Sequence, residues 1–147
     1  MRKILIILCS FIIFYCNAQI KKINFLIMID EKPSLIVSNL QIESQSMKTI
    51  NANYNVGTID ISEDYYSTLI SDESPSLNLT FEAILPNRAI SSKYLVNIPK
   101  LFFNQKYIII NIFNKNSKTF KKRYSKKDQI NKEYYVVIET PSSMKFD

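Results

Sequence analysis

The stretch INFLIMID, residues 23–30, decides the fold that we expect for this chain. Every second residue from Ile23 to Ile29 is a branched or aromatic apolar residue, so these side chains share one face of an extended strand. Such alternation with a period of two indicates a half-buried β-strand. The next four residues, EKPS, form a turn, because Pro33 cannot donate a hydrogen bond to a ladder.

Similar strand-like runs recur along the rest of the chain. They are SLIVSNLQI (34–42), MKTINANYNV (47–56), GTIDI (57–61), SLNLTFEAIL (76–85), KYLVNIP (93–99), KYIIINIFN (106–114), TFKKRY (119–124) and EYYVVIET (133–140). NKNSK (114–118) is typical of a hairpin turn between two of them. Gly57, the only glycine of the chain, marks a turn or a bulge.

One segment favours a short helix instead. SEDYYSTLIS (62–71) offers Ser62 as the N-cap, with Glu63 and Asp64 in the first turn. No recurrent helical pattern separates the other runs. We therefore expect an all-β protein, a single antiparallel β-sandwich of about seven or eight strands.

The runs KYIIINIFN and EYYVVIETP, after a leader that ends in NAQ, resemble small exported bacterial β-sandwich proteins. Transthyretin-like and immunoglobulin-like modules are among them. The resemblance extends over most of residues 19–147 as a strand pattern, although the chain lacks the glycine-rich turns of transthyretin-like proteins. Modules of this kind bind or space other components, so the resemblance implies a binding role without naming a partner.

The N-terminus has the three parts of a secretory signal peptide. Arg2 and Lys3 precede an apolar run of about a dozen residues, which ends in the small residues of CNAQ. We expect cleavage between Ala18 and Gln19, which would leave a domain of residues 19–147 that is periplasmic or secreted.

Two other interpretations of the N-terminus compete with cleavage. An uncleaved anchor is one, although the apolar segment 4–20 is at the short limit for crossing a bilayer. A lipid on Cys9 or Cys16 is the other. Lipoprotein processing requires a small residue before the cysteine, and Leu8 and Tyr15 stand there.

Removal of residues 1–18 changes the composition of the chain. Both cysteines lie in that segment, so the remaining domain has no disulfide and depends on its core. That domain keeps 17 Lys and Arg and 13 Asp and Glu residues, a net charge of +4. Six of the positive charges lie in KTFKKRYSKK (118–127), and the rest has a net charge of −2. The basic character is therefore local.

The residue types exclude several chemistries. The chain has no histidine, which excludes Ser-His-Asp and Cys-His catalysis and histidine-ligated metals. A single glycine excludes glycine-rich phosphate loops. A carboxylate pair, a Ser–Lys arrangement or an oxygen-only calcium site remain. We expect no cofactor, no metal and no enzyme activity.

The remaining acidic candidates have ordinary structural roles as alternatives. Asp60, Ser62 and Asp64 have the alternate spacing of calcium ligands, but an acidic turn or helix cap accounts for them as well. Asp60 with Glu82, and Glu43 with Glu139, are candidate acid–base pairs if they lie on neighbouring strands. Exposed carboxylates are common on strands, so the pairs carry little weight.

The tyrosine pairs Tyr65–Tyr66 and Tyr134–Tyr135 are candidates for an aromatic binding face. Adjacent side chains of a strand point to opposite faces. One tyrosine of each pair is therefore expected in the core.

The basic stretch KTFKKRYSKK permits two interpretations. As an edge strand, it would place Phe120 and Tyr124 toward the core, while its lysines prevent edge-to-edge aggregation. As a functional patch, it would attract an anionic envelope surface, such as a phosphorylated lipid or an acidic glycan. Basic and aromatic residues together also suit single-stranded nucleic acid, but export argues against that partner. The patch consists of Lys118, Lys121, Lys122, Arg123, Lys126 and Lys127.

The sequence thus predicts an exported, non-enzymatic β-sandwich that serves as a binding or accessory module of the cell envelope or periplasm. Its partner would be another envelope protein or an anionic envelope surface, and no transmembrane segment is expected after residue 18. A small secreted hydrolase that uses carboxylates, or an anchored subunit of an envelope machine, is the alternative.

Overall fold

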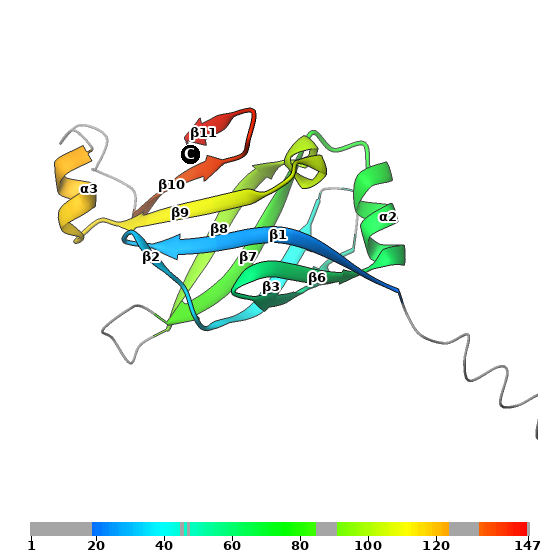
Figure 1. Cartoon of the computed structure of the whole chain (residues 1–147), viewed down its shortest axis with the longest axis horizontal. Coiled ribbons are helices and arrows are strands. Elements are labelled where there is room, and N and C mark those ends of the chain that lie inside the picture. The colour runs from blue at the N-terminus through cyan, green and yellow to red at the C-terminus, as the bar shows by residue number, and fades with distance from the viewer. Residues whose placement is uncertain (1–18, 45, 47, 85–90, 124–132, 147) are drawn as a thin grey trace, which may run out of the picture.

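The computed structural model describes residues 19–44, 46, 48–84, 91–123 and 133–146 (Figure 1). The proposed signal peptide, residues 1–18, lies outside these ranges. The strands are β1 (Ile20–Ile29), β2 (Lys32–Pro33), β3 (Val37–Glu43), β4 (Ile50–Asn51), β5 (Asn53–Asn55), β6 (Gly57–Ser62), β7 (Ser76–Ile84), β8 (Ser91–Pro99), β9 (Ile108–Asn114), β10 (Tyr134–Glu139) and β11 (Met144–Phe146). The helices are α2 (Glu63–Ser71), the 3₁₀ helix η1 (Lys100–Asn104) and α3 (Lys118–Arg123).

Two sheets form the fold, which confirms a mainly β, sandwich-like architecture. Sheet A has the order β11-β10-β9-β1-β6-β5, with β2 paired to the end of β1. Sheet B has the order β4-β3-β7-β8. The two- and three-residue strands explain why more strands are present than the long apolar runs predicted.

The expectation of a purely antiparallel fold is wrong for one strand pair. β1 and β9 are parallel, with Phe25 opposite Ile108 and Ile29 opposite Ile112. The other strand pairs among the described residues are antiparallel. The chain leaves sheet B at the end of β8, passes through η1 and enters sheet A in the direction of β1 (Figure 1). This crossing between sheets breaks the up-and-down alternation that hairpins alone would produce.

The alternating apolar residues of β1 lie in the core, as the stretch INFLIMID predicts. Ile27 and Ile29 have no exposed surface, and they pack in one cluster with residues of sheet B such as Leu79, Phe81 and Val96. Burial of each such side chain stabilises the fold by roughly 1.5–3 kcal/mol. Since the domain has no disulfide, this cluster is its main source of stability.

Two tight turns have left-handed backbone conformations. Gly57 has a φ of +93° after β5, which confirms the turn predicted at the only glycine. Asp30 and Glu31 have φ values of +50° and +69° between β1 and β2. Positive φ at both central residues is characteristic of the two-residue hairpin loops whose twist matches the strands.

The helix predicted at residues 62–71 is confirmed as α2. Ser62 is its N-cap, and the Ser62 hydroxyl accepts a hydrogen bond of 3.3 Å from the Tyr65 amide. Glu63 and Asp64 occupy the first turn, where negative charge is favourable. Leu69 is fully buried and anchors the helix to the core.

The strand predicted at residues 119–124 is wrong, because Lys118–Arg123 forms the helix α3. The Ser117 hydroxyl accepts a hydrogen bond of 3.0 Å from the Phe120 amide, which caps the helix. Phe120 is fully buried in a small second cluster with Phe113 and Val137. An interpretation of this segment as a guarded edge strand therefore fails, although Phe120 is a core residue as predicted.

Side chains from sheet A cover part of the edge of β8. The Tyr134 hydroxyl accepts a hydrogen bond of 2.8 Å from the Leu95 amide and donates one of 2.9 Å to the Leu95 carbonyl. The Lys145 ammonium donates to the carbonyl and the side-chain oxygen of Asn97, both at 3.0 Å. These side chains join the two sheets where no strand bridges them.

Among the described residues, no helix is both long enough and apolar enough to cross a membrane.

Candidate functional site

A pocket of about 790 Å³ opens at the α3 end of the molecule. Four segments that are distant in sequence line it: the β1–β2 turn, the start of β8, the connection from β9 to α3, and the start of β10. We call it the Asp30 pocket. It gathers charged and hydroxyl side chains around a fixed polar floor.

Asp30 and Asn114 form the floor. The backbone amide of Asn114 donates to the Asp30 Oδ1 at 2.9 Å, and its side-chain Nδ2 donates to the Asp30 Oδ2 at 3.0 Å. The Tyr94 hydroxyl donates to the Asn114 Oδ1 at 3.2 Å. Each bond fixes the orientation of the next group, so the floor is rigid and its polar atoms are satisfied.

The floor is built on unusual backbone. At positive φ the β-carbon of either residue crowds the following carbonyl; aspartate can offset this cost because its short polar side chain hydrogen-bonds locally, whereas glutamate adopts the conformation less readily. Residues held in such conformations are over-represented at functional sites. The conformation aims the Asp30 carboxylate at the end of β9 instead of at solvent.

Tyr94 forms the deepest part of the floor. It is almost fully buried, and its ring meets the Tyr134 ring edge to face with centroids 5.1 Å apart. Burial raises the pKa of the Tyr94 hydroxyl, and the nearby Asp30 carboxylate acts in the same direction, whereas the hydrogen bonds of the hydroxyl with Asn114 and Ser92 lower the pKa. The hydroxyl therefore remains a hydrogen-bond donor at physiological pH.

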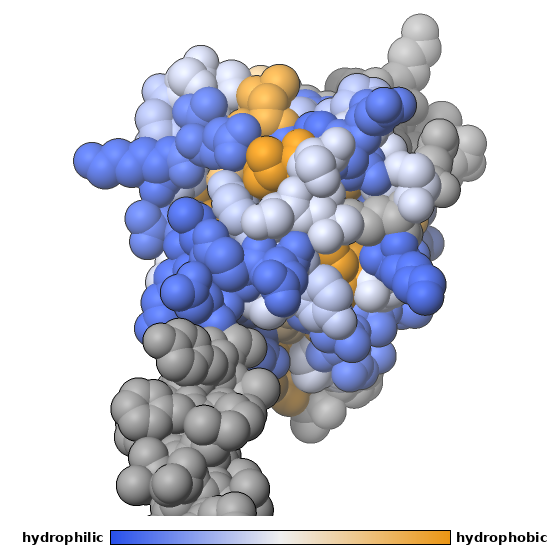
Figure 2. Space-filling model, turned by 90° about the vertical axis from the view of Figure 1, so that its right-hand side faces the viewer, coloured by the Kyte–Doolittle hydropathy of each residue, from blue (hydrophilic) through white to orange (hydrophobic). Residues whose placement is uncertain are grey.

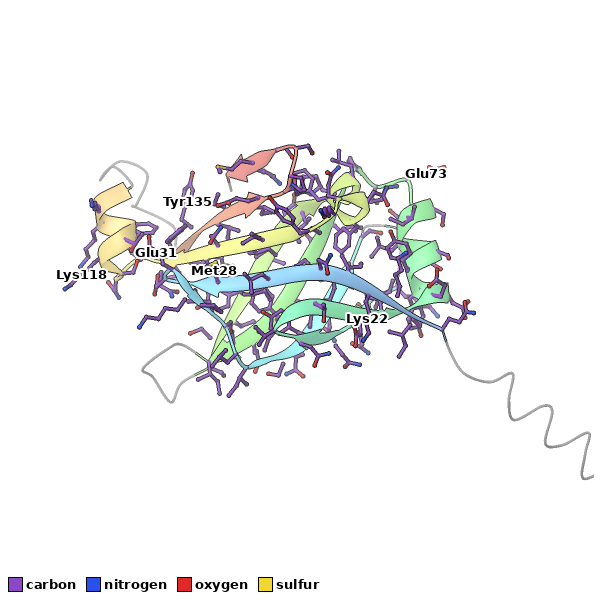
Figure 3. The ribbon with its side chains drawn as sticks, viewed as in Figure 1. Lys22, Met28, Glu31, Glu73, Lys118 and Tyr135 are labelled. Carbon is purple, nitrogen blue, oxygen red and sulfur yellow. The ribbon has the colours of Figure 1, made fainter. Side chains whose placement is uncertain are left out.

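Four lysines contribute to the walls of the pocket. Lys32 comes from β2, Lys93 from β8, Lys115 from the β9–α3 connection and Lys118 from the start of α3. Asp30 and Glu133 are the acidic residues of the lining. Lys118 and Glu31 lie at the same end of the molecule (Figure 3). The lining is thus net positive, and its one deep carboxylate is already engaged by Asn114.

Only part of the predicted basic patch lies at this pocket. Lys118 lines it, whereas Lys121 and Lys122 are exposed on α3. Arg123 ends α3. The side chain of Arg123, and Tyr124, Lys126 and Lys127, lie outside the described residues.

The two carboxylate pairs do not come together. Asp60 is on β6 of sheet A and Glu82 is on β7 of sheet B. Each has buried strand neighbours on both sides, so the two side chains leave opposite outer faces of the sandwich. Glu43 on β3 and Glu139 on β10 are separated in the same way. Neither pair can share a substrate.

The calcium candidates lie on β6 and the first turn of α2. Ser62 is occupied as the helix cap, and Asp64 is exposed. Asp60 accepts a bond of 3.3 Å from the Asn55 side-chain amide, while its Oδ1 is buried without a partner among the described residues. No group of three or more acidic residues that could hold a metal ion occurs in the described part of the chain.

The tyrosine pairs divide between core and surface. Tyr66 packs against the main core, whereas the Tyr65 side chain is 52% exposed. Tyr134 packs in the main core and Tyr135 in the small cluster beneath α3, on the opposite face of sheet A. Tyr134 and Tyr135 lie on opposite faces of a strand, as predicted. Tyr65 and Tyr66 lie on a helix, whose geometry places one side chain at the surface and the other against the core.

Sequence reasoning missed Asp30, Tyr94 and Asn114. Asp30 and Asn114 are 84 residues apart, and only the parallel pairing of β1 and β9 brings their strand ends together. The one local signal was an acidic pair directly after a strongly alternating strand, where a tight turn is required.

Comparisons of the chain with protein-family models, with curated proteins and with solved structures give no significant match.

Proposed function

We propose that this chain is an exported, non-enzymatic binding module that captures an anionic component of the cell envelope or periplasm in the Asp30 pocket. The observation that carries the proposal is the convergence of Lys32, Lys93, Lys115 and Lys118 from three separate segments on one pocket. A ligand with phosphate or carboxylate groups fits that lining. Export rests on the signal-like N-terminus of the sequence.

The rigid floor supports recognition of a polar ligand. Asn114 and Tyr94 are already fixed by internal hydrogen bonds, so a ligand does not have to order them on binding. Hydroxyls at the rim, from Ser92, Ser117 and Thr119, add donors and acceptors beside the lysines. The pocket therefore suits an anion that also carries polar groups better than a flat charged surface.

A binding role is favoured over hydrolysis by the state of the carboxylates. Of the two acidic residues in the lining, Asp30 and Glu133, Asp30 accepts one hydrogen bond from Asn114 on each oxygen, which fixes it as part of the floor. The predicted pairs Asp60–Glu82 and Glu43–Glu139 are divided between two sheets. Retaining and inverting glycosidases, in contrast, need two carboxyl groups within about 10 Å.

The test is binding of two anionic probes at low salt: vesicles of phosphatidylglycerol in phosphatidylcholine, and soluble polygalacturonate. The variant K93Q/K118Q should bind the preferred probe about ten- to thirty-fold more weakly, because each lysine contributes roughly 1 kcal/mol. The control K22Q/K106Q removes the same charge at exposed positions that do not line the pocket. The control should bind the probe with nearly the affinity of the parent protein.

Equal losses in the two double variants would reveal only general charge attraction and would contradict a pocket. Binding to neither probe would contradict the proposed function. Electrostatic binding to either probe should be abolished in about 1 M salt, because the Debye length falls to about 3 Å. Preference for polygalacturonate over vesicles would identify an acidic glycan, and the reverse a phosphorylated lipid.

A further inference from the structure

A second pocket, of about 600 Å³, lies against α2, at the other end of the sandwich from α3 (Figure 1). One wall is the exposed side of α2, and the other is the segment before β4. We call it the Tyr65 pocket. Figure 2 views this end of the molecule, where hydrophilic and intermediate residues cover most of the surface and hydrophobic residues occur in a few places.

A partly exposed aromatic side chain lines the pocket. The Tyr65 side chain is 52% exposed, while Leu69 and Tyr66 attach the same helix to the core. The Tyr66 hydroxyl donates to the Asn104 side-chain oxygen at 3.3 Å, which adds a second attachment. Tyr65 therefore offers an apolar ring face and a hydroxyl to a ligand.

A carboxylate is held in a fixed orientation at the same pocket. The hydroxyls of Ser44 and Ser46 donate to the Asp72 Oδ2 at 2.9 and 2.5 Å. The Ser74 amide donates to the Asp72 Oδ1 at 2.8 Å. The Ser74 hydroxyl is a further donor to this carboxylate, so four donors match its roughly four acceptor positions and hold it in place.

The helix hydroxyls in the lining are also acceptors toward the pocket. The Thr68 hydroxyl donates to the Asp64 carbonyl at 2.9 Å, and the Ser71 hydroxyl donates to the Thr68 carbonyl at 3.1 Å. Their hydrogens are used within the helix, and their oxygen lone pairs remain. The pocket thus presents two hydroxyl acceptors and one fixed carboxylate next to one aromatic side chain.

We propose that the Tyr65 pocket binds a neutral saccharide. A pyranose ring has an apolar C–H face that fits against the Tyr65 ring, and its hydroxyl groups donate to the hydroxyl oxygens of Thr68 and Ser71. Lys48, also in the lining, offsets one of the negative charges of Asp72 and Glu73, so the site does not select strongly for a cation. This function is separate from the anionic ligand of the Asp30 pocket.

The test is titration of the protein with neutral hexasaccharides of glucose, mannose, xylose and N-acetylglucosamine, followed by calorimetry and by amide NMR shifts. At least one probe should bind and shift the amides of α2. The variant Y65A should lower its affinity about fivefold or more, as truncation of an aromatic anchor does. Y65F keeps the ring and should lose less than Y65A.

Further variants distinguish binding at this pocket from binding elsewhere on the surface. Y107A removes an exposed tyrosine outside the pocket and should bind as the parent does. T68V keeps the side-chain shape, removes the hydroxyl acceptor and should weaken binding without unfolding the exposed helix surface. Binding should persist in about 1 M salt and in K93Q/K118Q, whereas anion binding at the Asp30 pocket should not.

Three results would overturn the proposal: no binding of any hexasaccharide, a smaller loss in Y65A than about fivefold, or an equal loss in Y107A. Thermal unfolding of each variant shows that it is folded before it is titrated. Because the saccharide and the anion are tested with different probes and different variants, either function can fail while the other stands.

Discussion

Asp72 illustrates how a single residue can organise the segments around it through hydrogen bonds. Its pKa is lowered well below the usual range, mainly by the hydrogen bond from Ser46 and then by those from Ser74. The free carboxyl has a pKa of about 3.9. A lowered pKa in the folded state means that the charged form stabilises the fold above about pH 4, and that this contribution is lost as the pH falls further.

The first prediction concerns that pH dependence. The variant D72N should be less stable than the parent at neutral pH, and the difference should shrink as the pH falls below about 4. Urea denaturation between about pH 2 and pH 7 measures it. E73Q alters the exposed neighbouring carboxylate and should leave the acid profile of the parent in place. A difference between D72N and the parent that is constant with pH would contradict the role of the charge.

The second prediction concerns the left-handed turn at Glu31. Glycine has no β-carbon, so E31G should relieve a conformational cost of roughly 1–2 kcal/mol and lose about 0.5–1 kcal/mol of chain entropy. The net result should lie between no change and a gain of about 1.5 kcal/mol in the free energy of unfolding. K32G, in the extended strand β2, should instead lose about 0.5–1 kcal/mol. Equal destabilisation by both variants would show that the Glu31 side chain matters more than its backbone.

Among the elements, α3 shows most clearly what the sequence could and could not predict. A run of lysine and arginine around Phe120 was expected to be a strand because the segments before and after it are strands. Ser117 at the N-cap was the signal for a helix, and lysine and arginine are good helix formers. The segment lacks the period-two apolar pattern that made β1 and β7 predictable.

The third prediction concerns how α3 is attached. F120A should lower the free energy of unfolding by about 3–5 kcal/mol, as truncation of a buried phenylalanine to alanine does elsewhere. Phe120 is fully buried in the small cluster between α3 and sheet A. K121A, on the exposed side, should change stability by less than about 0.5 kcal/mol. Denaturant unfolding of both variants gives the comparison. A small effect of F120A would mean that α3 does not pack on sheet A as described.

At the scale of the whole molecule, local patterns predicted most strands, the helix α2 and the two-sheet architecture. They could not predict that β1 pairs in parallel with β9, because no local pattern encodes which distant strand becomes a neighbour. The Asp30 pocket depends on that pairing, and so its residues could not be grouped from the sequence. Lys118 and Tyr134 are the two lining residues that local sequence patterns place in candidate sites, one in the basic patch and one in a tyrosine pair.

The fourth prediction concerns the whole chain in its cell. The purified protein should begin at Gln19 and appear in the periplasmic or secreted fraction, because residues 1–18 have the parts of a signal peptide. N-terminal sequencing measures this directly. A18R, which places a large charged residue at the expected cleavage site, should accumulate uncleaved. A retained Met1, or a lipid on Cys16, would contradict the prediction.

The central position of β1 also has a kinetic consequence. β1 is the first strand of the domain, yet its neighbour β9 follows more than 80 residues later, as the 84-residue separation of Asp30 and Asn114 illustrates. Folds dominated by such distant pairings fold slowly, in roughly milliseconds to seconds. A chain that emerges N-terminus first cannot complete sheet A until β9 has been made. The topology therefore delays folding, and under the proposed export this delay would keep the chain extended for passage through a narrow channel.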